Sequence, residues 1–304
     1  MEESNSRKEG RIIKGYGGFY YVDCEGNLWE CRLRGRFRKE KREALAGDRV
    51  GFTVVDEKNL KGVVDEIHPR KNRLIRPLVA NVDQALVVLA ASDPTPDLWL
   101  LDRLLVMIHH GGIEPLLCWN KSDLAPEDGL RELMAPYEAA GVRQLVTCAA
   151  KGEGIEALRQ ALRERTTVFA GPSGVGKSSL LNQLEPGLAL KTGMVSEKLG
   201  RGRHTTRHVE WIPLSFGGWV ADTPGFSQIY LPEDLSREQL TDAYGEFDAY
   251  RGDCRFISCS HLKEKDCGIR RALGKGLLDE GRYERYKTFM LELGERDKRQ
   301  AWPK

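Results

Sequence analysis

The sequence predicts a multidomain protein in which a small β-barrel, an α/β domain with a parallel-rich sheet and a mainly helical region follow one another. Three observations support this fold class. Short β-prone segments separated by turn residues fill the first seventy-five residues, apolar strands alternate with helical stretches from 82 to 225, and a polar, helix-prone segment with clustered cysteines follows. We therefore place the domains at 1–75, 76–232 and 233–304.

Composition narrows the class of protein. The 304 residues include 47 basic and 45 acidic side chains, a net charge of +2, and 40% are hydrophobic, which is typical of a globular chain. No apolar run approaches the ~20 residues of a membrane span, and the polar N-terminus lacks a signal-peptide core. Seven cysteines, an odd number, favour reduced thiols plus a metal site over disulfides. We expect a cytoplasmic protein that does not contact a membrane. Nothing in the sequence requires more than a monomer.

The first domain carries a basic segment within the expected barrel. Strands are expected at 11–15, 19–24, 28–33 and 49–55, and this spacing suggests an OB-type barrel. The segment 31–43 places positive charges around Phe37 in an expected loop, the composition of a surface that grips phosphates and bases. A solvated loop is the alternative. The candidate RNA-binding residues are Arg32, Arg34, Arg36, Arg38, Lys39, Lys41 and Arg42.

The second domain alternates strands with helices. The expected strands are 82–90, 115–119, 143–148, 167–170, 208–214 and 219–221. The expected helices are 98–110, 127–140, 155–165 and 177–184, and the C-terminal tail is predicted to be helical over 276–298.

A phosphate-binding loop follows the strand at 167–170. Residues 171–178 match the pattern GxxxxGK[ST] and stand between a strand and a helix, as such a loop requires. Glycines let backbone N–H groups turn toward phosphate oxygens. Lys177 would reach the β- and γ-phosphates and act in catalysis, and the Ser178 hydroxyl would coordinate Mg²⁺. The candidate nucleotide-binding residues are Gly171, Pro172, Ser173, Gly174, Val175, Gly176, Lys177, Ser178 and Ser179.

Two boxes predict guanine as the base. The run Asn120, Lys121, Ser122 and Asp123 fits NKxD, in which the aspartate accepts hydrogen bonds from the ring N–H and the amine of guanine. Adenine lacks that pair of donors, so the site would leave a carboxylate unpaired with ATP. Cys148 and Ala149 stand where GTPases carry a Ser-Ala pair whose backbone contacts the base.

A DxxG box completes the nucleotide set. Asp222 follows an apolar strand and would hold Mg²⁺ through a water, and the Gly225 amide would sense the γ-phosphate. Thr205 or Thr206 would complete the Mg²⁺ shell as part of a first switch, and the sequence does not choose between them.

The third domain contains a candidate metal centre. Cys254, Cys259, His261 and Cys267 offer three thiolates and an imidazole within fourteen residues, a full tetrahedral set for one Zn²⁺ ion. Four protein ligands leave no open position, so the zinc would be structural.

Together these motifs resemble the RsgA/YjeQ family of circularly permuted, small-ribosomal-subunit-dependent GTPases. The resemblance covers nearly the whole chain and implies an OB-fold barrel, a permuted G domain and a zinc-binding C-terminal domain. It implies GTP hydrolysis stimulated by the small (30S) ribosomal subunit, contact with its rRNA, and a role late in its maturation. His204 matches a switch histidine proposed as catalytic in this family, and an RNA- or phosphate-facing role is equally compatible. Phe226 replaces the water-orienting glutamine of Ras-like enzymes, so intrinsic hydrolysis should be slow.

The order of the boxes predicts the permutation. A Ras-like chain runs from the P-loop through DxxG to NKxD, whereas here NKxD and Cys-Ala precede the P-loop, the threonines and DxxG. The cyclic order is kept, and DxxG leads directly into the C-terminal domain. Three rival functions remain open: an RNA-binding assembly scaffold with structural nucleotide, a signalling GTPase with protein partners only, and a P-loop kinase or ATPase.

Overall fold

The computed structural model describes residues 6–39, 43–74, 78–188, 209–222 and 230–301. The chain forms two compact units: one comprises Met1–Leu86 and Ile155–Phe226, and the other comprises Val87–Gly154 and Ser227–Lys304. Each unit is therefore built from two separate stretches of chain.

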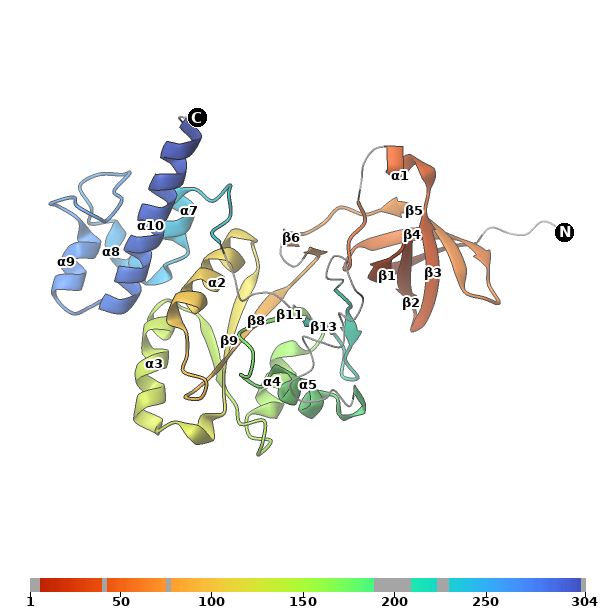
Figure 1. Ribbon diagram of the computed structural model, residues 1–304, viewed down its shortest axis with the longest axis horizontal. Helices are drawn as coiled ribbons and strands as arrows, with labels where there is room; N and C mark the ends of the chain where they lie inside the picture. Colours follow the sequence, from red (N-terminus) through yellow and green to blue (C-terminus); the bar gives the residue numbers. More distant parts are fainter. Residues whose placement is uncertain (1–5, 40–42, 75–77, 189–208, 223–229, 302–304) are drawn as a thin grey trace. The chain divides into compact units, whose positions relative to one another are not determined.

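The N-terminal residues form the predicted barrel (Figure 1). Its strands close in the order β1-β2-β3-β5-β4, and β3 and β5 are parallel while the other pairs are antiparallel. Ile12, Val22, Phe52 and Val64 fill the interior as alternate residues of their strands. The fifth strand was not predicted, because its run of apolar residues is short. The strands are β1 (Arg7–Tyr16), β2 (Phe19–Cys24), β3 (Asn27–Leu33), β4 (Arg49–Asp56) and β5 (Lys61–Ile67).

The prediction of a loop around Phe37 is wrong. Cys31 lies inside the barrel as part of β3, and a short helix, α1 (Gly35–Lys39), follows. Phe37 is 3% exposed and packs in the barrel core. Burying an aromatic ring stabilises the fold by about 2 kcal/mol, so this ring serves the core and is not available to stack on a base.

The α/β sheet has the strand order β10-β9-β8-β11-β13-β12. If the six strands are renumbered in cyclic chain order with β11 as strand 1, the sheet reads 2-3-1-4-5-6 from the β12 edge. In this order the first strand is central and the chain winds out to both edges, as in doubly wound nucleotide-binding sheets. The sheet thus has the topology that the permuted order of boxes predicts. The strands are β8 (Gln84–Ala90), β9 (Glu114–Asn120), β10 (Arg143–Val146), β11 (Thr166–Ala170), β12 (Ile212–Pro213) and β13 (Trp219–Asp222). Two short strands, β6 (Arg73–Leu74) and β7 (Val79–Ala80), pair with each other outside it.

The expected strand at 208–214 is much shorter than predicted. Residue 208 lies outside the described residues, and only Ile212–Pro213 pairs with the sheet, antiparallel to β13. The Trp211 N–H instead donates a hydrogen bond of 3.1 Å to the Ile13 carbonyl of the barrel strand β1. The backbone at 211 is therefore committed to the barrel and cannot extend β12.

The helices agree closely with the sequence. Both α2 (Leu98–His110) and α5 (Lys177–Leu184) have the predicted bounds, α3 (Glu127–Ala139) ends one residue early, and α4 (Ile155–Leu162) three residues early. The C-terminal region contains α7 (Arg237–Asp242), α8 (Asp248–Arg251), α9 (Gly268–Gly274) and α10 (Glu280–Ala301), which gather in the blue part of Figure 1. Short 3₁₀ turns occur at η1 (Ser122–Leu124), η2 (Pro186–Leu188) and η3 (Gly245–Phe247). Leu240, Phe247, Tyr286 and Phe289 form the centre of this helical core.

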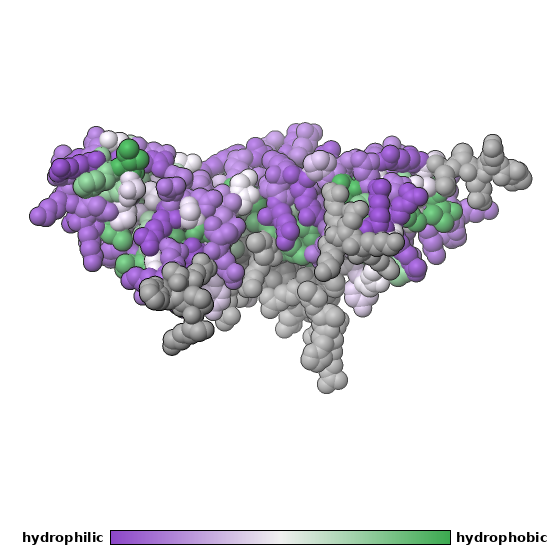
Figure 2. Space-filling model, turned by 90° about the horizontal axis from the view of Figure 1, so that it is seen from above, coloured by the Kyte–Doolittle hydropathy of each residue, from purple (hydrophilic) through white to green (hydrophobic). Residues whose placement is uncertain are grey.

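In the part of the chain that the structure describes, no helix is long and apolar enough to cross a membrane. On the face shown in Figure 2, hydrophilic residues cover most of the described surface and the hydrophobic patches are small.

Candidate functional site

The phosphate-binding loop begins where β11 ends. All five residues of β11 are buried, which fixes the direction in which the chain enters the loop. Gly171, Gly174 and Gly176 have φ angles of 130°, 83° and 97°, a backbone conformation that side chains disfavour. The three glycines therefore let the loop curl tightly ahead of α5, and the N-terminus of α5 has no side-chain cap.

Lys177 and Ser178 open the helix α5 behind this loop. The Lys177 ammonium donates to the carbonyl oxygens of Gly171 at 2.8 Å and Pro172 at 2.7 Å, which holds it across the loop. Ser178 is buried in the first turn of the helix, and Val175 anchors the loop in the core. The loop thus places one cation and one hydroxyl beside a helix N-terminus, an arrangement suited to phosphate and Mg²⁺.

In the second unit, Asn120 joins the two segments predicted to recognise guanine. This side chain is 1% exposed at the end of β9, and its Oδ1 accepts hydrogen bonds from Thr147 Oγ1 and from the Ala149 N–H, each at 3.1 Å. The NKxD turn and the Cys148–Ala149 turn are therefore held side by side. The Lys121 ammonium donates to the Asp93 carbonyl at 2.7 Å, a contact that no motif in the sequence signals.

Asp123 lies exposed on the η1 turn, next to Ser122. The Cys148 thiol donates to Asp123 Oδ1 at 3.1 Å, and the Cys148 backbone pairs with Glu153 in both directions. One carboxylate oxygen is thus oriented by the thiol while the carboxylate remains open to solvent. Such a group can accept two hydrogen bonds from a base.

Several predicted residues lie outside the described part of the chain. His204, Thr205, Thr206 and Gly225 belong to this group, and Asp222 is described only through its backbone at the end of β13. Their assignments remain predictions. The strand pairing does place Asp222 opposite Phe169 of β11, one residue before that strand ends at the phosphate-binding loop.

The four predicted metal ligands lie together. Cys254, Cys259, His261 and Cys267 present ligand atoms that are all within 4.8 Å of one another. Cys254 Sγ is 3.6 Å from His261 Nδ1 and 3.9 Å from Cys267 Sγ, close to the ~3.8 Å that separates two sulfurs on one tetrahedral Zn²⁺. The Gly268 N–H donates to Cys254 Sγ at 3.3 Å, a contact that stabilises a thiolate and orients it as a ligand. The donor set therefore fits zinc.

Burial shifts the pKa values of three of these side chains. It raises the pKa of the Cys259 thiol to about 12 and also raises that of Cys267, while it lowers the pKa of His261. The imidazole is therefore neutral, as a ligand must be, and the thiols need a bound cation to ionise at neutral pH. His261 adopts a φ of 59°, and its carbonyl accepts a hydrogen bond from Tyr283 at 2.7 Å, so the loop is fixed by the helical core.

Of the seven basic residues predicted to bind RNA, the structure describes the side chains of three. Arg32 lies over the Phe19 ring at 4.5 Å, and Arg36 donates to the Asp65 carbonyl. Arg34 is exposed, the side chains of Arg38 and Lys39 are not described, and Lys41 and Arg42 lie outside the described residues. Their contact with RNA remains a prediction.

The permuted sheet, the phosphate-binding loop and the NKxD turn define a P-loop protein of the GTPase class. A family model described as RsgA GTPase matches residues 67–232, and one described as RsgA N-terminal domain matches 9–64. The chain belongs to the RsgA GTPase family.

Relatives match it over nearly their full length. Proteins named small ribosomal subunit biogenesis GTPase RsgA are 49% identical in Moorella thermoacetica, over 95% of this chain and 99% of theirs, and 47% identical in Alkaliphilus metalliredigens, over 94% and 97%. The crystal structure of YjeQ from Thermotoga maritima matches with a TM-score of 0.82 at 34% identity, covering 95% of this chain and 99% of that one. The structure of YloQ, described as a circularly permuted GTPase, matches with a TM-score of 0.80 at 37% identity, covering 97% and 98%.

Proposed function

We propose that this protein hydrolyses GTP to GDP and phosphate in the cytoplasm, and that hydrolysis times its association with and release from the maturing small (30S) ribosomal subunit. The proposal rests on one arrangement: Asn120 accepts hydrogen bonds from Thr147 and Ala149, and the Cys148 thiol donates to Asp123. These contacts hold the NKxD turn beside Cys148 and Ala149, in a chain that also has a phosphate-binding loop. Relatives that match over almost their whole length bear the name of this activity.

Guanine recognition comes from the Asp123 carboxylate. It would accept the ring N–H and the amine of the base, while Asn120 keeps the turn in register with Cys148 and Ala149. Adenine offers no such donors and would leave the carboxylate unpaired, an arrangement that disfavours binding by roughly 1–3 kcal/mol. ATP should therefore compete poorly.

The phosphates would lie on the loop at 171–178. Lys177 would move from the Gly171 and Pro172 carbonyls to the β- and γ-phosphates, where its charge stabilises the charge that develops during transfer. Ser178, Asp222 and one of the switch threonines would hold Mg²⁺, which neutralises phosphate charge when bound. Phe226 cannot orient water, so the attacking water depends on His204 or on a group from the ribosomal subunit.

The remaining domains would hold RNA. The barrel offers the exposed Arg32 and Arg34, and the cysteine-histidine centre would, with one structural Zn²⁺, stabilise the segment 254–267 of the C-terminal region. We propose that both contact rRNA, and that the protein acts as a monomer.

The decisive experiment is a GTP hydrolysis assay with and without purified small subunits. Stimulation by at least about tenfold is expected, because an external group that completes a GTPase site raises turnover strongly. The Lys177→Ala variant should show no stimulation of GTP hydrolysis by small subunits. A rate with subunits equal to the basal one would refute the coupling to the subunit and favour an RNA-binding scaffold.

Two further measurements distinguish this function from a kinase or ATPase and from a signalling GTPase. In competition binding, ATP that displaces labelled GDP at the same concentration as GTP would contradict the role of Asp123 and favour a kinase or ATPase. Sedimentation with small subunits should differ between the GTP-analogue and GDP states. A protein that never sediments with them would instead be a signalling GTPase with protein partners.

A further inference from the structure

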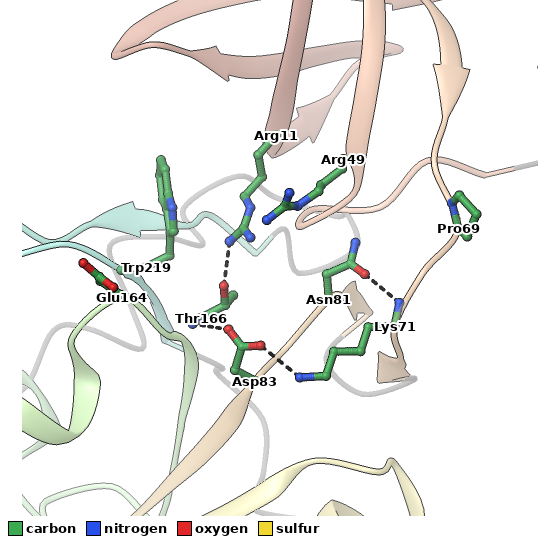
Figure 3. A pocket seen from close by; sticks show the side chains of 10 residues that line it. Arg11, Arg49, Pro69, Lys71, Asn81, Asp83, Glu164, Thr166 and Trp219 are labelled. Carbon is green, nitrogen blue, oxygen red and sulfur yellow. Dashed lines mark hydrogen bonds and ion pairs between the residues drawn. The ribbon is translucent and has the colours of Figure 1, made fainter.

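A cavity of about 520 Å³ lies within the first unit, where the barrel meets the strands of the α/β sheet (Figure 3). Arg11 of β1 and Arg49 of β4 enter it from the barrel. Thr166 at the start of β11 and Trp219 at the start of β13 line the opposite wall. None of these residues belongs to the predicted nucleotide or metal sites.

Two cations point into the same space. Figure 3 shows the guanidinium groups of Arg11 and Arg49 directed toward one another, and the antiparallel register of β1 and β4 pairs the two residues. Among the described residues, no carboxylate oxygen lies within 4.0 Å of either group. Like charges so placed repel each other, although the exposure of Arg49 to water weakens the repulsion.

Arg11 is fixed by neutral partners. Its Nη1 donates to Thr166 Oγ1 at 2.7 Å, and the group lies 5.8 Å from the centre of the Trp219 ring. Burial, followed by the charge of Arg49, lowers the pKa of Arg11, although the charges of Asp83 and Asp23 act in the opposite direction. A partly buried guanidinium is thus held in a defined position, with no counter-ion in contact among the residues that the structure describes.

The nearby acidic groups do not balance the two arginines. Asp83 Oδ1 accepts from the Lys71 ammonium at 3.1 Å and Asp83 Oδ2 accepts from the Thr166 N–H at 2.8 Å, so this carboxylate is already neutralised. Glu164 lies exposed beside Trp219, across the cavity from Arg49 (Figure 3). Asp23 of β2 is the cross-strand partner of Arg11 and acts on its charge, but it forms no ion pair with Arg11 and does not line the cavity. Among the residues that line the cavity, three cations (Arg11, Arg49 and Lys71) stand against two carboxylates (Asp83 and Glu164), which leaves a net positive charge.

We propose that this cavity binds a phosphate group, with the guanidinium groups of Arg11 and Arg49 as its donors. Guanidinium groups match phosphate oxygens in geometry and charge, and two of them on one anion replace a repulsion with two charge-assisted contacts. The phosphate belongs either to the backbone of an RNA or to a free phosphorylated compound. The site is separate from the loop at 171–178 and does not depend on the proposed function.

The test uses the full chain saturated with a non-hydrolysable GTP analogue, so that the phosphate-binding loop is filled. Pyrophosphate is titrated by calorimetry, and thermal unfolding is followed in parallel. The wild type should bind pyrophosphate and melt at a higher temperature in its presence. Arg49→Gln should weaken binding about tenfold, as expected for the loss of one charge-assisted contact. Because Arg49 is exposed, this variant should fold normally.

A matched control removes two charges elsewhere on the barrel. Lys58 and Lys61 are exposed and do not line the cavity, so the K58Q/K61Q double variant should bind pyrophosphate as the wild type does. R11Q/R49Q should not bind it measurably. Equal affinity in the wild type and Arg49→Gln, or no binding by the wild type, would overturn the proposal.

A single-stranded RNA oligonucleotide then identifies the source of the phosphate. The salt dependence of RNA binding gives the loss of affinity expected from removing positive charge alone. If Arg49→Gln weakens RNA binding by more than this loss, and K58Q/K61Q does not, the cavity holds an RNA phosphate. If pyrophosphate binding is lost in Arg49→Gln but RNA binding is unchanged, the ligand is a free phosphorylated compound. Both results support the site and assign its ligand.

Discussion

The Cys148 thiol donates a hydrogen bond of 3.1 Å to Oδ1 of Asp123, the carboxylate predicted to recognise guanine. The thiol is fully buried and the carboxylate is exposed. The sequence suggested only that the backbone at Cys148 tolerates cysteine in place of serine. The side chain itself instead orients the group that selects the base.

Cys148→Ala should weaken guanine nucleotide binding. Loss of one hydrogen bond to a carboxylate removes about 1 kcal/mol, which corresponds to roughly a fivefold rise in the Kd for GDP. Cys148→Ser should retain wild-type affinity, because the hydroxyl can donate in the same way. Cys24→Ala, which removes a buried thiol from the barrel, is the control. Fluorescent GDP titration measures all four proteins, and a Cys148→Ala variant with unchanged Kd would show that the thiol does not position Asp123.

Lys177→Ala should abolish GTP hydrolysis. The ammonium is the only side-chain cation that the phosphate-binding loop at 171–178 contributes, and its hydrogen bonds to Gly171 and Pro172 place it over that loop. We expect a fall in kcat of about 10²-fold or more, since transition-state charge would lose its nearest cation. Lys58→Ala on the barrel is the control. Phosphate release under single-turnover conditions is the measurement, and a normal rate would refute the assignment of the loop.

Metal removal should unfold the loop at 254–267. Elemental analysis should find about one zinc per chain, and a chelator should lower the melting temperature because folding and metal binding are coupled at such sites. Cys254→Ser should lose the zinc, whereas Cys24→Ser, outside the cluster, should keep it. A fully folded chain without metal would contradict the ligand assignment.

Much of this arrangement could be predicted because local patterns encode it. The glycines of the phosphate-binding loop are needed wherever φ is positive, and the alternation of strands and helices fixed α2 and α5 to the residue. The metal ligands were found because four soft donors stand close together in the sequence. Chemistry confined to one short segment is visible without a structure.

Contacts between distant segments could not be predicted. The sequence predicts a loop around Phe37 between two strands of the barrel, whereas the ring packs in the barrel core, which only the tertiary structure shows. The pairing of Arg11 with Arg49 depends on the register of β1 and β4. The Cys148–Asp123 bond depends on the placement of β9 beside β10. Each of these contacts depends on a tertiary arrangement that the periodicity of the sequence does not reveal.

A buried charge network attaches the C-terminal helices to α2, and it too was not foreseen. Arg282 of α10 donates to Asp102 of α2 at 2.8 Å and to Glu246 at 2.5 Å, and Arg285 donates to the other oxygen of Asp102. Asp102 and Arg282 are 1% and 2% exposed. Burial opposes the charge of Arg282, but Asp102 and Glu246 outweigh it and raise its pKa. Arg282 therefore stays charged in the core of the second unit.

Asp102→Asn should destabilise the second unit by about 3–5 kcal/mol, because it leaves two buried guanidinium groups facing a neutral amide. The loss should be larger than that of the matched change Asp128→Asn on the exposed surface of α3, which is expected to remain within about 0.5 kcal/mol. Urea unfolding monitored by tryptophan fluorescence measures both. Since the guanine turn is built on β9 and not on this network, GDP affinity at low temperature should change little in Asp102→Asn. Equal stability of the two variants would mean that the ion pairs of Asp102 contribute no more than surface charges, and that other contacts, among them the aromatic packing of Tyr244 and Tyr286, hold α10 in place.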